Sequence, residues 1–257
     1  IIFFFKLYLG HISMTLLKTK KKLINGIKIW IVEVGEPLPI PGENSRLMRA
    51  GQLAERLVKD DVDVTWWVSD FNHANKSLYD LKKLPEKDEF KVLANGIKAK
   101  FLHGRTYHKN ASIARLLHNR DIAKNFRRTA FNKPRPDLIF CCYPTIDLAV
   151  AATDYGYHHD VPVILDIRDL WPEVFIHVLP TPYWLNKLLI KPIERIANHA
   201  LKRATALSAI SEPILNWGLK KIGRKRNDLD HVFHLSYVKS SFSRDVKNMS
   251  DNQWRSL

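Results

Sequence analysis

Residues 161–173 constrain the fold of this chain more than any other stretch, because their character changes abruptly halfway along. Residues 161–165 are apolar and rich in β-branched side chains, which predicts a short buried parallel strand. Asp166, Arg168 and Asp169 follow at the point where this strand should leave the sheet. Ligands of open α/β sheets bind outside the carboxyl ends of the strands, so these charges lie where chemistry would be done. The stretch therefore predicts an enzyme or another ligand-binding protein.

Short apolar runs alternate with helical patterns along most of the remaining chain. This alternation predicts βαβ units, and hence an α/β fold with a mostly parallel sheet of about seven strands. The polar residues 70–95 show weak periodicity, which predicts a long excursion between two strands. We expect the strands at residues 27–34, 62–68, 97–102, 138–142, 161–165, 205–210 and 231–235. We expect the helices at residues 45–59, 111–128, 146–155, 184–203 and 212–221.

The composition indicates a globular protein, since 46% of its 257 residues are hydrophobic and 26% are charged. The formal net charge of +15 implies anionic partners, which include nucleic acid, phosphorylated ligands and an acidic membrane surface. The two cysteines, Cys141 and Cys142, are adjacent in a predicted strand, so their side chains should point to opposite faces. We expect two buried free thiols, which suit a reducing compartment and have no metal-ligand spacing around them.

The N-terminus begins without a methionine and opens with a short apolar run. This run is shorter than the ~20 residues that a membrane-spanning helix needs, and no basic region precedes it as in a signal peptide. Met14 is a candidate start of translation. We therefore expect residues 1–26 to be an extension that is partly non-native or flexible.

Two segments beyond predicted strands offer candidate substrate-binding residues. Gly42, Asn44 and Arg46 lie between the first strand and the first helix, at the phosphate position of dinucleotide-binding folds. Their loop lacks the G-x-G-x-x-G pattern, which argues against a nicotinamide or flavin enzyme, and it equally fits a proline-stiffened surface loop. His73 follows the second strand, where it could reach a cleft, although a lone histidine is more often an ordinary surface residue.

Two further segments combine basic and apolar side chains. In the helix predicted at 111–128, the apolar residues within 113–117 share a face that becomes basic one turn later. Either the helix extends beyond the core, or its end binds an anion. The basic residues on this face are Arg120, Lys124, Arg127 and Arg128. Residues 183–191 mix aromatics, aliphatics and lysines, which is typical of a membrane-interface helix and equally of a helix packed on a sheet. Trp184 and Lys187 would make the membrane contact.

Residues 163–173, with the sequence Val-Ile-Leu-Asp-Ile-Arg-Asp-Leu-Trp-Pro-Glu, resemble a motif in the N-terminal domain of GT-B glycosyltransferases of family 4. The likeness is closest to the bacterial enzymes of surface-polysaccharide synthesis, such as those for O-antigen or capsule. This motif is fairly specific, and residues 42–51, 66–73 and 107–118 support it. The likeness extends over about residues 27–237.

The resemblance implies two Rossmann-like domains that face each other across a cleft, each an open, mostly parallel sheet with helices on both faces. Residues 27–237 would form the N-terminal, acceptor-binding domain. Residues 238–257 would form a linker or the start of a C-terminal domain that binds the nucleotide-sugar. Transfer would retain the anomeric configuration and would need no metal or other cofactor. The acceptor would be a lipid-linked glycan at the inner face of the cytoplasmic membrane.

The resemblance also implies roles for the charged residues of the motif. Arg168 stands where many members carry a histidine, and with Asp169 it would act as a catalytic contact to the transferred sugar or the acceptor. Arg168 stays protonated and cannot act as a general base, which suits a front-face mechanism in which the leaving phosphate helps to deprotonate the acceptor. Asp166 and Glu173 would bind substrate. The alternative for these charges is a structural ion pair at the end of a strand.

The family's donor site, a glutamate-containing motif, has no counterpart after Tyr237, and the residues that follow are too few for a second domain. We therefore expect a truncated chain that is inactive alone. A second class of function stays open. The chain could be a non-catalytic basic α/β module that docks on anionic membrane or nucleic acid, with nucleic acid the less favoured partner.

Overall fold

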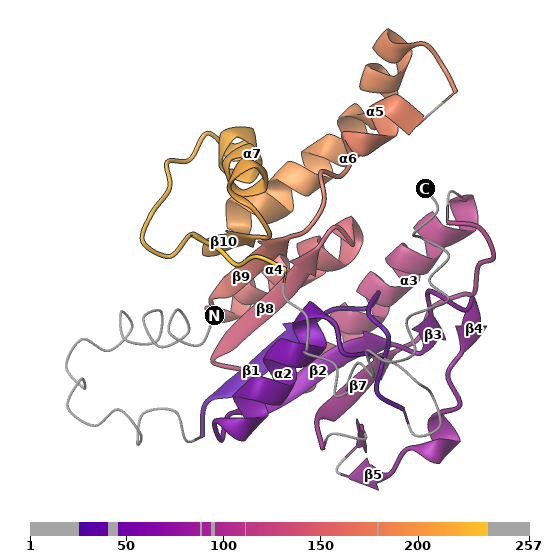
Figure 1. Ribbon diagram of the computed structural model, residues 1–257, viewed down its shortest axis with the longest axis vertical. Helices are drawn as coiled ribbons and strands as arrows, with labels where there is room; N and C mark the ends of the chain where they lie inside the picture. The colour runs from indigo at the N-terminus through magenta and orange to yellow at the C-terminus, as the bar shows by residue number, and fades with distance from the viewer. Residues whose placement is uncertain are drawn as a thin grey trace, which may run out of the picture.

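A nine-stranded sheet forms the centre of the molecule, and helices cover both of its faces (Figure 1). The computed structural model describes residues 26–40, 46–87, 89–93, 96–110, 112–178 and 180–235. In sheet order the strands are β11 (His231–Val232), β10 (Ala206–Ala209), β9 (Val163–Ile167), β8 (Leu138–Tyr143), β1 (Lys28–Val32), β2 (Asp63–Ser69), β7 (Lys98–Leu102), β6 (Phe90–Val92) and β5 (Glu86–Lys87).

Every neighbouring pair of strands from β7 to β11 is parallel, and β6 and β5 extend the sheet antiparallel. The chain builds the sheet outward from β1 in two directions, first through β2 to β7 and then through β8 to β11. The order therefore reverses between β1 and β8. This arrangement confirms the α/β class and the mostly parallel sheet; its parallel strands match the expected number of about seven, and β6 and β5 add two more. The reversal marks the place where open sheets form a ligand crevice.

The helices divide unequally between the two faces of the sheet. They are α2 (Arg49–Lys59), α3 (Ile113–Ala130), α4 (Ile146–His159), α5 (Val174–Val178), α6 (Tyr183–Arg203) and α7 (Glu212–Ile222). Helices α3, α4, α6 and α7 contribute to one hydrophobic layer, and α2 contributes to the other. Helix α5 and the first turns of α6 extend beyond the carboxyl edge of the sheet (Figure 1).

The central strands form because their apolar residues are buried on both faces, as parallel strands require. The strand expected at 161–165 runs instead from Val163 to Ile167. Asp166 therefore lies inside β9 and is fully buried, and the expectation that it follows the strand is wrong. The apolar Ile167 after it supplies the residue that continues the strand past the charge.

The excursion expected at residues 70–95 contains short elements of its own. A two-stranded hairpin of β3 (Phe71–Asn72) and β4 (Ser77–Leu78) follows β2 directly. A 3-10 helix, η1 (Leu81–Lys83), then leads to the antiparallel strands β5 and β6. These elements are too short for their periodicity to be visible in the sequence.

Helix α3 buries a different face from the one expected. The residues that it buries are His118, Ile122, Ala123, Phe126 and Ala130. Their spacing of about four residues places them on one face of the helix. The face with Ile113, Leu116 and the basic residues points outward, and Ile113 is 76% exposed. The premise that a buried face turns basic is therefore wrong, because the two leading apolar residues are exposed exceptions.

Cys141 and Cys142 are both buried and free, as expected. Because they are neighbours in β8, their side chains enter the hydrophobic layers on opposite faces of the sheet.

Candidate functional site at the carboxyl edge of the sheet

A crevice of about 130 Å³ lies at the carboxyl edge of the sheet, where the strand order reverses. The segment after β1 and the segment between β8 and α4 border it, as expected for the reversal point of an open sheet. The segment after β2, residues of α3 and Trp171 complete the lining. The crevice therefore draws on segments that are distant in sequence and that only the strand order brings together.

Glu33 forms the acidic wall of the crevice. It follows β1, and its carboxylate accepts hydrogen bonds from the backbone N–H groups of Gly35, at 2.8 Å, and Glu36, at 2.7 Å. Burial, and then the charge of Glu36, raises the pKa of Glu33 to about 7, although Arg168 acts in the opposite direction. A carboxyl group with this pKa can carry or release a proton near neutral pH.

The opposite wall is aromatic and basic. Nδ1 of His73 and the hydroxyl of Tyr107 are hydrogen-bonded, and the ring of Tyr107 packs against Phe71 and His118. Burial, and then the charges of Arg115, Lys76 and His118, lowers the pKa of His73 to about 4. His73 is therefore neutral at physiological pH. His118 donates a hydrogen bond from Nδ1 to the carbonyl oxygen of Arg105, at 2.6 Å.

Arg115 and Trp171 meet at the mouth of the crevice. The guanidinium carbon of Arg115 lies 5.2 Å from the centre of the Trp171 ring, a cation–π contact. The indole N–H of Trp171 donates to a carboxylate oxygen of Asp169 at 3.1 Å, and the hydroxyl of Tyr143 donates to the Trp171 carbonyl oxygen. These bonds fix the ring, so the motif at 163–173 builds part of the crevice wall.

A buried network of charges lies beneath the motif. Asp166 accepts two hydrogen bonds from Arg49, at 2.8 and 2.9 Å, one from Arg168 at 3.0 Å and one from Ser208 at 2.6 Å. Burial alone would raise the pKa of Asp166, but the Arg49 hydrogen bonds and the charge of Arg168 outweigh it, and the pKa is lowered. Asp166 is therefore ionised and paired inside the protein.

Arg168 turns into this network and is largely buried, with 18% of its side chain exposed. Besides Asp166 it contacts the carboxylate of Glu36 and the thiol of Cys142, whose Sγ lies 2.8 Å from Nη2. Glu36 in turn accepts from the backbone N–H groups of Ala50 and Gly51 at the start of α2. The network thus joins the β1 loop, the start of α2 and β9 beneath the crevice.

The remaining motif and loop residues lie in other places. Asp169 is exposed, and it also accepts from the backbone N–H of Leu170 at 2.8 Å. Glu173 forms an ion pair with Lys221 of α7. Arg46 is exposed ahead of α2, while Gly42 and Asn44 lie outside the described residues. Of the expected substrate-binding residues, the structure therefore places His73 in the crevice and Asp166 beneath it.

The expected anion and membrane contacts lie on outer faces of two helices. The basic residues on the outer face of α3 are Arg120, Lys124, Arg127 and Arg128. Trp184 and Lys187 are exposed at the start of α6, and the Lys187 ammonium lies 4.5 Å from the centre of the Tyr183 ring. Neither set lines the crevice.

Several residues of the crevice have no role that the sequence predicts. Glu33 follows β1 directly, but the strand expected at 27–34 includes it, so the sequence pattern did not set it apart. Tyr107, Arg115 and His118 entered only as support for the resemblance. Their meeting depends on the position of β7 and α3 in the sheet, which periodicity does not reveal.

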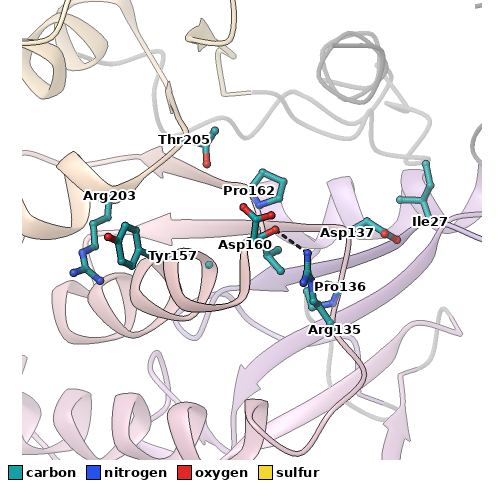
Figure 2. Close-up of a pocket in the computed structure, with 11 residues that line it drawn as sticks. Ile27, Arg135, Pro136, Asp137, Tyr157, Asp160, Pro162, Arg203 and Thr205 are labelled. Atoms are coloured by element: carbon teal, nitrogen blue, oxygen red, sulfur yellow. Dashed lines mark hydrogen bonds between the residues drawn. The ribbon is translucent and has the colours of Figure 1, made fainter. Parts of the chain in front are cut away.

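A second hollow, of about 920 Å³, lies at the amino edge of the sheet (Figure 2). Arg135 donates to the carbonyl oxygen of Asp160 at 2.9 Å, and Asp137 accepts from the backbone N–H of Lys28 at 2.8 Å. Arg203 lies over the ring of Tyr157, 4.3 Å from its centre, and donates to Asp154 at 2.9 Å. The two arginines and Asp137 of this hollow are thus paired within the protein itself.

Two absences concern metal ions and membranes. Within the residues that the structure describes, no group of three or more histidine, cysteine, aspartate or glutamate side chains is placed to hold a metal ion. None of the helices in this part of the chain has the length and hydropathy of a membrane span.

Neither a family model nor a curated protein matches the sequence. Among solved structures, Anabaena Alr3699/HepE in complex with UDP and glucose is similar, with a TM-score of 0.44 and 16% identity over 82% of this chain and 45% of that chain. Arabidopsis thaliana UGT89C1 complexed with quercetin is also similar, with a TM-score of 0.45 and 13% identity over 84% of this chain and 52% of that chain. This chain spans about half the length of each.

Proposed function

We propose that this chain provides the acceptor-binding domain of a retaining glycosyltransferase that uses a nucleotide-sugar. One observation carries the proposal. The motif that resembles family 4 glycosyltransferases also builds the crevice, because Asp169 holds the indole of Trp171 in the crevice wall. A second domain would hold the nucleotide-sugar across from this edge. The acceptor would then meet the donor at the carboxyl ends of the strands.

The residues around the crevice suit a transfer in which the acceptor is positioned and the leaving phosphate takes its proton. Glu33, with a pKa of about 7, can accept a hydrogen bond from an acceptor hydroxyl or donate one to an acceptor oxygen. Arg168 neutralises Asp166 and Glu36 beneath the crevice, and it stays protonated. We assign Arg168 to holding the crevice floor and Asp169 to positioning Trp171. Neither role needs a metal ion.

A sugar-transfer assay on lipid extracts tests this function, with a panel of radiolabelled nucleotide-sugars as donors. The product of the complete gene should label lipid, and Trp171→Ala in it should lower labelling at least tenfold. Tyr157→Phe, at the amino edge, is the matched control and should leave labelling unchanged. The 257-residue chain alone should give only background. Labelling by this chain alone would contradict the division into two domains, and absence of labelling with every donor would contradict glycosyl transfer.

We also propose that α6 docks the protein on the inner face of the cytoplasmic membrane. Its first turns expose Trp184, Leu188 and Leu189, and Trp184 is 68% exposed. Lys187 and Lys191 are exposed among them. Aromatic and aliphatic side chains flanked by lysines suit the interface of an anionic bilayer. This placement would bring a lipid-linked glycan to the edge of the sheet that carries the crevice.

Flotation with vesicles that contain anionic lipid tests the docking. The protein should float with these vesicles, and the double variant Trp184→Ala and Leu188→Ala should not. Arg127→Gln on α3 is the control for charge and should still float. The exposed basic face of α3 favours the second class of function, a non-catalytic module that binds anions. Flotation that depends on α3 and not on α6 would support that alternative.

A further inference from the structure

The size of the crevice limits what it can hold. Its volume is about 130 Å³. An apolar cavity of about 150 Å³ in a protein holds benzene, so the crevice has about the size of one six-membered ring, and the substituents of a sugar would have to extend into solvent. A longer glycan would have to continue into solvent.

The basic wall of the crevice contains a cation without an acidic partner. Arg115 donates to the carbonyl oxygen of Asn110 at 3.2 Å and lies over the ring of Trp171. Within the part of the chain that the structure describes, no carboxylate lies within 4.0 Å of the Arg115 side-chain nitrogens. Lys76 lies near the same wall, 5.1 Å from the centre of the Tyr107 ring.

Each acidic group around this wall has at least one hydrogen-bond partner within the protein. Asp70 lies 2.7 Å from His103, and Asp121 lies 2.6 Å from Arg105. The carboxylate of Glu33 accepts the two backbone N–H groups of its own loop. Burial is the main cause of the lowered pKa of His73, and the charges of Arg115 and Lys76 add to it. These two cations, and not the burial, would favour a bound anion.

Aromatic rings flank the same space. Trp171 and Tyr107 both line the crevice, and each is held by a hydrogen bond to a neighbouring side chain. Fixed aromatic faces provide a large rigid contact surface for a ring. A guanidinium beside them can bind a carboxylate or phosphate through two parallel hydrogen bonds.

From this geometry we infer that the crevice binds an anionic sugar, one pyranose ring that carries a carboxylate or a phosphate. Arg115 binds the oxyanion, and Trp171 and Tyr107 flank the ring. The inference rests on the proposed function for its biological setting, where the sugar belongs to the acceptor. Binding itself requires no transfer, so the two can fail separately.

Titration of the 257-residue protein, followed by NMR shifts of the indole N–H groups at low salt, tests this inference. The probes are glucuronate, glucose 1-phosphate, uncharged glucose and inorganic phosphate. At least one charged sugar should bind ten times more tightly than glucose and than phosphate alone. Arg115→Gln should abolish this preference, and Arg115→Lys should keep part of it as a point charge. Arg120→Gln, on the outer face of the same helix, should keep all of it.

The two charged probes distinguish the sources of the oxyanion. Preference for glucuronate identifies an acidic sugar of the glycan, and preference for glucose 1-phosphate identifies the phosphate that joins a sugar to its carrier. Equal binding of charged and neutral sugars, binding of phosphate as tight as that of the sugar phosphate, or an unchanged preference in Arg115→Gln would overturn the inference. Lack of binding by every probe would overturn it as well. Lost transfer with intact binding would count against the proposed function alone.

Discussion

The two edges of the sheet differ in how their charged groups are paired, and the sizes of their hollows do not reveal this difference. The hollow at the amino edge is about 920 Å³, whereas the crevice at the carboxyl edge is about 130 Å³. In the larger hollow Arg135, Asp137 and Arg203 already have partners within the protein (Figure 2). In the smaller one Arg115 lies over the ring of Trp171, and no carboxylate of the described residues lies within 4.0 Å of its side-chain nitrogens. A site is therefore indicated here by a charge without an ionic partner and not by volume.

The two edges are also stabilised differently. Beneath the carboxyl edge a network of charges, centred on Asp166, joins segments that are far apart in sequence. At the amino edge Gly156 lets α4 pack directly against Val161 and Val163. Substitutions at matched positions can therefore separate the contribution of charge from that of packing.

The largest effect is expected from Asp166→Ala at the carboxyl edge. It leaves Arg49 and Arg168 buried without their shared carboxylate, which should lower the free energy of unfolding by about 3–5 kcal/mol. Urea unfolding measures this change. Asp137→Ala is the matched loss of a carboxylate at the amino edge, where the group is exposed, and should cost below about 1 kcal/mol. Equal costs at the two positions would remove the contrast between the edges.

An intermediate effect is expected from Gly156→Ala at the amino edge. An added Cβ would lie 2.3 Å from Cγ2 of Val163 and 2.6 Å from the carbonyl oxygen of Val161, and this backbone cannot move freely. Overpacking of this kind should cost about 1–3 kcal/mol in the same urea experiment. Gly35→Ala in the crevice is the control, because its Cβ would meet only the flexible carboxylate of Glu33, at 3.3 Å. Tolerance of Gly156→Ala would show that the packing of α4 against Val161 and Val163 is not close.

The smallest effect is a dependence of stability on pH, which reports the ionisation of Glu33 in the crevice. The pKa of Glu33 rises from 4.5 to about 7 on folding, so between these values the folded protein holds a proton that the unfolded chain has released. Its contribution to stability therefore falls as the pH rises through this window. The Tm of Glu33→Gln relative to that of the parent should therefore increase as the pH rises from about 5 to about 8. The Tm of Glu55→Gln on α2 should not change in this way. A constant difference across this range would contradict the raised pKa.

Much of the fold could be predicted from sequence, because parallel strands buried on both faces are continuous apolar runs. Strands β8 and β2 were found within one residue at each end for this reason. Strand β9 was misplaced because a charge normally ends such a run, and here Asp166 is instead paired inside it. The buried face of α3 was misjudged because Ile113 is exposed, and one apolar residue at a helix start weighs heavily in a short pattern.

The crevice could be predicted only in part. The motif residues and His73 carry a local signal, a polar side chain just past an apolar strand. The partnership of His73 with Tyr107 joins positions 34 residues apart and depends on where β7 pairs in the sheet. No local pattern contains that information, and neither propensity nor charge patterning could place Arg115 over Trp171.

The adjacent thiols of β8 offer a way to time the opening of the two sides of the molecule. Cys141 enters the layer of α3 and α4, and Cys142 enters the layer of α2, and burial raises the pKa of both thiols. Thiol reagents act on the thiolate, so each cysteine should react only when its own layer separates from the sheet. Pulsed alkylation of the two single-cysteine variants would then show whether the layers detach together or one after the other.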